Sequence, residues 1–139
     1  MRIAVIGAGP RGLSMVERLL HNRGTEKFKI YLFDSIGPGG TIWRTNQSKE
    51  LLMNTVAEQV TLFTDETMSS NGKVFSGPNL FLWSKTFAPE FIKATVPTEA
   101  IDFFLEEAEK LDANGQSTRI FHGLYQKWFY EQLVQEFSE

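Results

Sequence analysis

Residues 3–14 read IAVIGAGPRGLS, and the class of fold follows from this stretch. The apolar run 3–6 is bounded by glycine, which predicts a short strand buried on both faces of a sheet. The glycines of residues 7–12 predict a tight turn. A helix comes next, with Glu17 and Arg18 on its polar side and Asn22-Arg23-Gly24 as its end. Its apolar positions recur at helical spacing: Leu13, Val16, Leu19 and Leu20.

A second strand is predicted at residues 29–33 (KIYLF), and it ends at Asp34. Strand, glycine turn, helix, strand and acid make one βαβ unit, which is right-handed with parallel strands. We therefore expect an α/β fold, a Rossmann-like FAD/NAD(P)-binding domain with a parallel sheet. Two strands are too few for a complete sheet of this kind, so residues 1–139 read as the N-terminal portion of a single domain, incomplete at its C-terminus.

Composition narrows the functional classes. The chain has 139 residues, of which 42% are hydrophobic and 22% charged, as in ordinary globular proteins. The net charge of −3 argues against a nucleic-acid or anionic-membrane binder, and the absence of cysteine excludes disulfides and thiolate metal sites. The sequence contains neither a run of about 18 apolar residues nor a signal peptide. A cytoplasmic protein is the expectation.

The rest of the chain carries weaker signals of secondary structure. A turn-rich loop occupies residues 37–40, and periodicity does not decide whether residues 51–53 and 60–63 are strands or turns of helix. Residues 69–78 predict an exposed loop. One helix is expected from Pro97 to a stop at Asn114-Gly115, and another from about Thr118 to Phe137.

Other polar candidates have modest interpretations. His21 lies at the end of the first helix, where contact with the helix C-terminus is expected, and His122 has no sequence neighbour for a metal site or triad. Ser14 lacks the Gly-x-Ser-x-Gly pattern of a nucleophile elbow. A solvated helix face is predicted for three acids: Glu106, Glu107 and Glu109.

The last predicted helix has an aromatic stripe consisting of Phe121, Tyr125, Trp128 and Phe129. We interpret this stripe as core packing. Because the sheet is incomplete, part of the stripe is expected to be exposed and to favour self-association.

The glycine turn has the pattern of a phosphate-binding loop. Gly7 lets the chain leave the strand sharply, Gly9 removes a side chain where backbone approaches a pyrophosphate, and Gly12 lets the helix pack closely. Pro10 and Arg11 begin the helix, whose free N–H groups attract phosphate. Arg11 either pairs with phosphate oxygens or faces solvent.

Asp34, at the end of the second strand, is placed to accept hydrogen bonds from the hydroxyls of a ribose, and its charge disfavours a 2′-phosphate. The alternative is an ordinary strand-to-helix turn with a solvated acid. FAD and NAD share this fingerprint. The long irregular stretch after Asp34 favours FAD, a cofactor that extends beyond its pyrophosphate, while an NAD-binding module of another enzyme class and a truncated, non-catalytic interaction domain remain open.

Residues 6–14 resemble the opening of the bacterial FAD-NAD(P)-binding protein family. Three further motifs are also similar to that family. They are Gly37-Pro38-Gly39 before Trp43-Arg44, the run LMNTVA (52–57) through TLFTD (61–65), and RIFHGLY (119–125) with Trp128 beyond it. The match touches nearly the whole chain. More distantly, the order of glycine turn, Gly40, Trp43 and Asn54 is similar to flavin-containing and Baeyer–Villiger monooxygenases.

The resemblance implies a two-dinucleotide-binding-domain flavoprotein that uses FAD, with NAD(P)H as the electron donor of the full-length protein and a small-molecule substrate that the sequence does not identify. The glycine turn would meet the FAD pyrophosphate and Asp34 the adenosine ribose. Gly40, Thr41 and Trp43 would line the path toward the flavin, and Asn54 and Thr55 would lie beside its ring. The function implied is that of an FAD-binding region of a flavin-dependent oxidoreductase, with a monooxygenase as one candidate.

Overall fold

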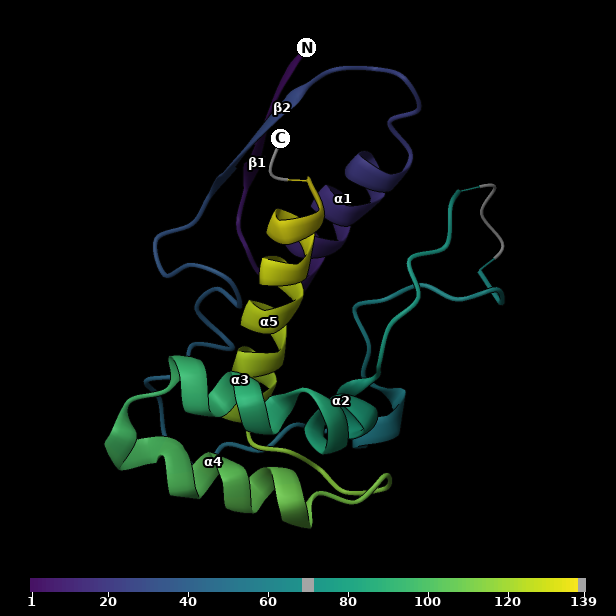
Figure 1. Ribbon diagram of the computed structural model, residues 1–139. Helices are drawn as coiled ribbons and strands as arrows, with labels where there is room; N and C mark the ends of the chain where they lie inside the picture. Colours follow the sequence, from purple (N-terminus) through teal and green to yellow (C-terminus); the bar gives the residue numbers. More distant parts are fainter. Residues whose placement is uncertain (69–71, 138–139) are drawn as a thin grey trace.

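A computed structural model describes residues 1–68 and 72–137. It begins with strand β1 (Arg2–Ile6), helix α1 (Pro10–His21) and strand β2 (Lys29–Phe33), shown in the upper part of Figure 1. The two strands are parallel, with Arg2 opposite Lys29 and Ile6 opposite Phe33. The Gly7 N–H extends the pairing by donating to the Phe33 carbonyl at 2.7 Å. The predicted βαβ unit and the α/β fold class are confirmed.

The sheet is covered on one face only. Val5, Ile30 and Leu32 pack against the core, whereas Ile6 is 81% exposed and Phe33 54% exposed. The prediction of a strand buried on both faces is therefore wrong. Side chains alternate across a strand, so one covering layer of helices buries only every second residue.

Helices α2 (Leu80–Thr86), α3 (Ala88–Thr95) and α4 (Thr98–Lys110) form a second group, in the lower part of Figure 1. The sequence did not predict α2 and α3. The start of α2 has a clear signal, because Asn79 Oδ1 accepts a hydrogen bond from the Leu82 N–H at 2.8 Å as an N-cap. Helix α4 ends at Lys110, before the predicted stop at Asn114-Gly115.

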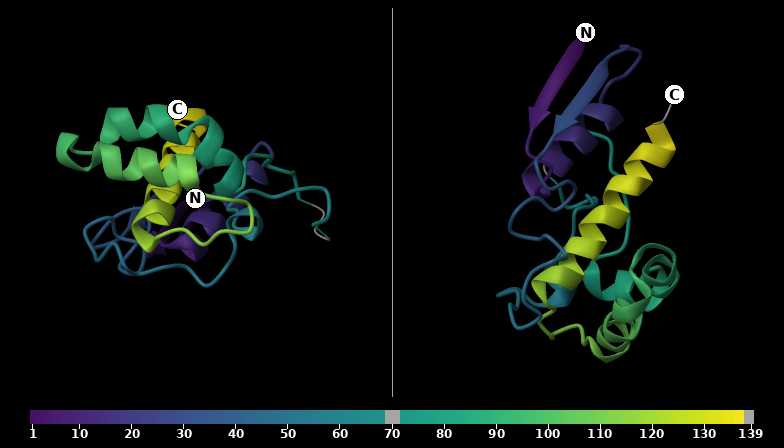
Figure 2. Two further views of the ribbon diagram at one scale, coloured as in Figure 1. Left: turned by 90° about the horizontal axis from the view of Figure 1, so that it is seen from below. Right: turned by 90° about the vertical axis from the view of Figure 1, so that its left-hand side faces the viewer.

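Helix α5 (Arg119–Phe137) connects the two groups, as the right-hand view of Figure 2 shows. Its first half packs against α2 and α3, and it also contacts α1. The aromatic stripe lies in the core, with Phe121, Tyr125 and Phe129 at 0% exposure, so the packing interpretation is confirmed. The expectation that part of this stripe is exposed is wrong. Three exposed apolar side chains, Ile6, Tyr31 and Phe33, lie instead on the open face of the sheet.

Residues 52–58, which lie in the sequence between the βαβ unit and α2, are hydrogen-bonded to the segment that leads into α5. The Met53 N–H donates to the Ser117 carbonyl at 2.9 Å, and the Ala57 N–H donates to the Gly115 carbonyl at 2.8 Å. A single antiparallel bridge pairs Leu52 with Thr118, and a short 3-10 helix follows at Ala57–Gln59. Residues 60–63 are neither helix nor strand. Of the loop predicted at 69–78, residues 69–71 lie outside the described residues, and 72–78 contain no helix or strand.

Two acids predicted to face solvent are covered by other parts of the chain, Glu17 completely and Glu107 in part. The Glu107 carboxylate accepts hydrogen bonds from the Thr118 N–H at 2.7 Å and the Thr118 hydroxyl at 2.8 Å, which joins α4 to the start of α5. Burial raises the pKa of Glu107. Glu17 is completely buried, because its position one turn beyond Leu13 places it on the packed face of α1.

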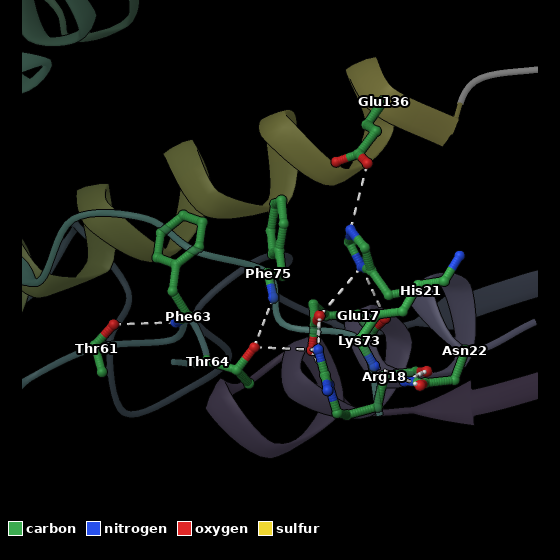
Figure 3. Close-up of polar contacts among 10 residues, drawn as sticks. All are labelled: Glu17, Arg18, His21, Asn22, Thr61, Phe63, Thr64, Lys73, Phe75 and Glu136. Atoms are coloured by element: carbon green, nitrogen blue, oxygen red, sulfur yellow. Dashed lines mark hydrogen bonds and ion pairs between the residues drawn. The ribbon is translucent and has the colours of Figure 1, made fainter. Parts of the chain in front are cut away.

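Glu17 belongs to a polar network that joins α1, the 61–75 segment and α5 (Figure 3). Its carboxylate pairs with Arg18 and lies 3.1 Å from His21 Nδ1, while His21 Nε2 lies 3.3 Å from a carboxylate oxygen of Glu136. Arg18 also donates to the Thr64 hydroxyl at 3.3 Å. The predicted contact of His21 with the end of its helix is present, since Nδ1 lies 3.2 Å from the Glu17 carbonyl.

Within residues 1–68 and 72–137, the helices are all too short or too polar to cross a membrane.

Candidate dinucleotide-binding site

The glycine turn between β1 and α1 has the backbone geometry that its sequence predicts. Gly7 has φ +101°, a conformation that side chains disfavour. A methyl group on Gly12 would overlap the carbonyl oxygen of Gly7, so only glycine fits at that position. Gly9 differs from both. Its backbone is extended, and a methyl group there would have as its nearest neighbour the Gly39 carbonyl oxygen, 3.9 Å away. Gly7 and Gly12 are therefore required by the turn itself, whereas Gly9 is not.

The first turn of α1 is open to an anion. Gly9 is the N-cap and has no side chain to accept from the helix, Pro10 occupies the first helical position, and the first turn contains no acid. The first N–H groups of a helix have no partner within it and lie at the positive end of its dipole. We call this first turn of α1 the cradle. It fits a pyrophosphate, because within residues 1–68 and 72–137 no side chain caps the turn and no acid lies in it.

Asp34 is bonded to the backbone on both sides of the strand end. Its Oδ2 accepts from the Ala8 N–H at 2.7 Å, and its Oδ1 accepts from the Ile36 N–H at 2.7 Å and the Gly37 N–H at 2.9 Å. These hydrogen bonds lower the pKa of Asp34, that to Ala8 most. The carboxylate is exposed and ionised at neutral pH. It therefore fastens the loop 36–40 to the glycine turn, a function that sequence reasoning missed.

Gly40 lies directly against the glycine turn. The Gly39 N–H donates to the Ala8 carbonyl at 2.9 Å, and a methyl group on Gly40 would lie 3.5 Å from the Gly9 nitrogen. Gly39 has φ +101° and Gly40 φ +60°, which lets the loop turn back at this point. Thr41 is exposed, and its carbonyl accepts from the Arg44 guanidinium at 2.6 Å. The structure thus brings the predicted residues Gly7 to Gly12, Asp34 and Gly40 together.

Trp43 links this cluster to α5. It is half-buried, its Cβ lies 3.4 Å from the position of a methyl group on Gly39, and its ring packs edge-on against His122 with 4.6 Å between ring centroids. A methyl group on Gly123 would overlap the Trp43 carbonyl oxygen, so Gly123 is what lets the loop lie on the helix. Trp43 therefore lies between the loop beside the glycine turn and α5, and its ring contacts His122.

Asn54 and Thr55 lie elsewhere. They follow Met53 in the segment fastened to residues 113–119, and Asn54 is exposed. The Thr55 hydroxyl is 3.5 Å from Asn54 Oδ1. Within residues 1–68 and 72–137, no hydrogen bond joins either residue to the glycine turn. Their role beside a flavin ring stays a prediction.

Arg11 faces an open groove of about 540 Å³ beside the first turn of α1. Arg11 and Ser14 line one side of this groove and residues 61–64 line the other. Arg11 is exposed, and none of the ion pairs within the described ranges includes it. Its guanidinium is therefore available to an anion near the turn.

His122 and Gln126 are two polar residues of α5 that sequence reasoning did not place near the site. His122 is 4% exposed and Gln126 0%. Burial lowers the pKa of His122 to about 4, so the ring is neutral at pH 7. The sequence did mark His122 as part of the RIFHGLY motif, next to Gly123. It gave no indication that this motif lies against Trp43.

Comparisons with known proteins agree with this geometry. Residues 4–139 match the protein family described as FAD-NAD(P)-binding. An L-aspartate N-monooxygenase (nitrosuccinate-forming) of Streptomyces cremeus is 38% identical over 96% of this chain and 21% of its own length. The protein of the same name from Streptomyces davaonensis is 38% identical over 95% of this chain and 20% of its own. A nitrosuccinic acid synthase of Aspergillus oryzae is 42% identical over 59% of this chain and 14% of its own.

The chain spans about a fifth of the length of the two Streptomyces relatives. The family match, by contrast, covers almost all of this chain and begins in β1, just before the glycine turn. The α/β fold, the glycine turn and the acid after β2 are what a dinucleotide-binding protein requires. The chain belongs to the FAD-NAD(P)-binding family.

Proposed function

We propose that this chain forms the pyrophosphate- and ribose-binding part of an FAD site in a flavin-dependent monooxygenase. The observation that carries the proposal is the cradle at the start of α1. Its N–H groups are free of side-chain caps and acids, Gly9 is open to close approach, and Asp34 secures the neighbouring loop. Residues 1–139 would be one part of a single FAD/NAD(P)-binding domain.

Each residue then has a defined role. The first turn of α1 and Arg11 bind the pyrophosphate, and the Asp34 oxygens, which keep lone pairs beyond those used by the backbone, accept from the adenosine ribose. Gly40, Thr41 and Trp43 cover the path along the cofactor, and Asn54 and Thr55 act beside the flavin. The bound flavin would supply the redox chemistry, with NAD(P)H as the electron donor.

The relatives suggest the substrate class. Because two of them are named as N-monooxygenases of L-aspartate, we propose that the whole protein oxidises the amino group of a small amino dicarboxylic acid. Support for this step is the identity of 38% over nearly the whole chain. The chain's own residues support the cofactor site more directly than they support the substrate.

The experiment is a flavin fluorescence titration of the purified chain with FAD, using Gly9→Ala and Gly12→Ala. Gly9→Ala should leave the free energy of unfolding within about 1 kcal/mol of wild type, because the methyl group has room, yet weaken FAD at least tenfold by filling the cradle. Gly12→Ala should also destabilise the fold, by about 2–3 kcal/mol, because its methyl group overlaps Gly7.

Lys93→Ala, an exposed change on α3 outside the candidate site, is the control and should affect neither quantity. Equal FAD affinity of wild type and Gly9→Ala would refute the assigned cradle. A wild-type chain that binds NADH in preference to FAD would instead favour an NAD-binding module of another enzyme class.

A further inference from the structure

Two buried polar side chains on one face of α5 have hydrogen-bonding groups without partners. His122 and Gln126 are four residues apart, so they lie one above the other on the helix. In the part of the chain that the structure describes, His122 Nδ1 and both Gln126 Oε1 and Nε2 are buried and form no hydrogen bond. Buried polar groups in native proteins are almost always paired, and exceptions concentrate at functional sites.

Their position connects them to the glycine turn. The His122 ring packs on the Trp43 ring, Trp43 lies against Gly39, and the Gly39 N–H is bonded to the Ala8 carbonyl. Gln126 is one turn further along α5 in the direction of the end that meets α1, where Glu136 approaches His21. His122 therefore lies beneath Trp43, on the protein side of the candidate site, and Gln126 lies one turn away on the same side of α5.

The chemistry of the pair selects an uncharged ligand. The His122 ring is neutral, because burial lowers its pKa to about 4, and a glutamine amide is neutral with one acceptor and two donor hydrogens. Neither group compensates the desolvation of a phosphate or carboxylate as a cation would. Together they match an uncharged planar edge that offers a donor and an acceptor side by side.

We propose that His122 and Gln126 bind an uncharged heteroaromatic edge of the cofactor, with segment 41–45 as the cover that must shift to admit it. This inference rests on the proposed FAD site and adds two ligand-binding residues to it. Both ring systems of FAD, the isoalloxazine and the adenine, present such an edge. The unpaired polar groups of His122 and Gln126 lower the stability of the chain without ligand. Hydrogen bonds to the bound ring system restore it.

Gln126→Met tests the proposal through two readouts of opposite sign. Methionine has a similar length and helix propensity but no polar group to leave unpaired. The melting temperature of the chain without ligand should rise by about 3–5 °C. The dissociation constant for FAD should rise about five- to tenfold, as expected for the loss of one hydrogen bond. His122→Phe keeps a ring against Trp43 and should behave in the same way.

Gln135→Met is the matched control, since it makes the same chemical change at an exposed position of α5 and should alter neither readout. Titrations with riboflavin and with ADP separate the two ring systems. Weakened riboflavin binding with unchanged ADP binding assigns the pair to the isoalloxazine, and the reverse result assigns it to the adenine.

The outcomes separate this inference from the proposed function. If wild type binds FAD and Gln126→Met binds it equally well, the inference is wrong and the FAD site stands. A lower melting temperature for both Gln126→Met and His122→Phe would also overturn it, because the polar groups would then be serving the fold. A wild-type chain that binds none of FAD, riboflavin and ADP would overturn the proposed function and this inference together.

Discussion

The three glycines of the first turn have different physical reasons to be glycine. Gly7 needs its positive φ, and Gly12 needs the absence of a methyl group that would overlap Gly7. Gly9 has neither constraint from the protein itself, so under the proposed function it is glycine because the pyrophosphate approaches there. A glycine pattern by itself does not distinguish a glycine that the turn needs from one that a ligand needs.

At the same scale, His122 predicts how stability depends on pH. The pKa of His122 falls from 6.5 to about 4 in the folded chain. Between these values the unfolded chain binds a proton at this residue and the folded chain does not, so stability falls as pH falls from 6.5 to about 4. The free energy of unfolding should decrease by up to about 3 kcal/mol across this interval.

The measurement is urea unfolding of wild type and His122→Phe at several pH values. Carboxylates titrate in the same interval, so the informative quantity is the free energy of unfolding of wild type minus that of His122→Phe. This difference should fall steadily as pH falls from 6.5 to about 4 and should be constant above that range. Parallel curves for the two proteins from pH 4 to pH 7 would mean that His122 is protonated equally in both states.

At the scale of the element, α5 is shaped by what packs on it. Almost every side chain from residue 120 to residue 129 is buried, so this helix has no wide polar face in its first half. The Tyr125 hydroxyl donates to the Pro78 carbonyl at 2.7 Å, and Gly123 accommodates the Trp43 carbonyl. The helix thus holds two separate loops in place, of which one covers the candidate site.

Gly123→Ala is the prediction for this element. Alanine in the interior of a helix normally stabilises by about 1 kcal/mol relative to glycine. Here the methyl group overlaps the Trp43 carbonyl oxygen, so we expect destabilisation by about 1–3 kcal/mol and a changed environment of the Trp43 ring. Thermal unfolding measures the first effect and Trp fluorescence the second. Gln135→Ala, at an exposed site of the same helix, is the control, and a Gly123→Ala variant more stable than wild type would show that the contact is absent.

At the scale of the whole molecule, α5 joins a βαβ unit to a group of helices (Figure 2). The polar network of Glu17 connects α1 to α5 and to Thr64 (Figure 3). Glu17 is fully buried, and Arg18 and His21 lie beside its carboxylate. Arg18 and Asn22 of α1 also bind the 61–75 segment, through Thr64 and the Lys73 N–H. The network therefore sets how α1 lies against the rest of the chain.

This network gives a prediction in the form of a mutant pair. Arg18→Leu leaves the Glu17 carboxylate buried without its main partner, which should destabilise the chain by about 2–4 kcal/mol. The double variant Glu17→Leu with Arg18→Leu removes both charges and should recover most of that loss. Denaturant unfolding measures both. Lys93→Leu, an exposed change on α3, is the control, and a double variant less stable than Arg18→Leu would contradict the assignment.

The sequence by itself determined the βαβ unit, the glycine turn, the acid after β2, and helices α4 and α5. These features depend on backbone preferences and periodicities that act over a few neighbouring residues. Only the tertiary structure placed α2 and α3, buried Glu17, covered part of Glu107, and brought His122 to Trp43. Short helices have little periodicity to detect, and a polar side chain is buried only where a distant segment supplies its partner or its cover, so neither follows from local sequence.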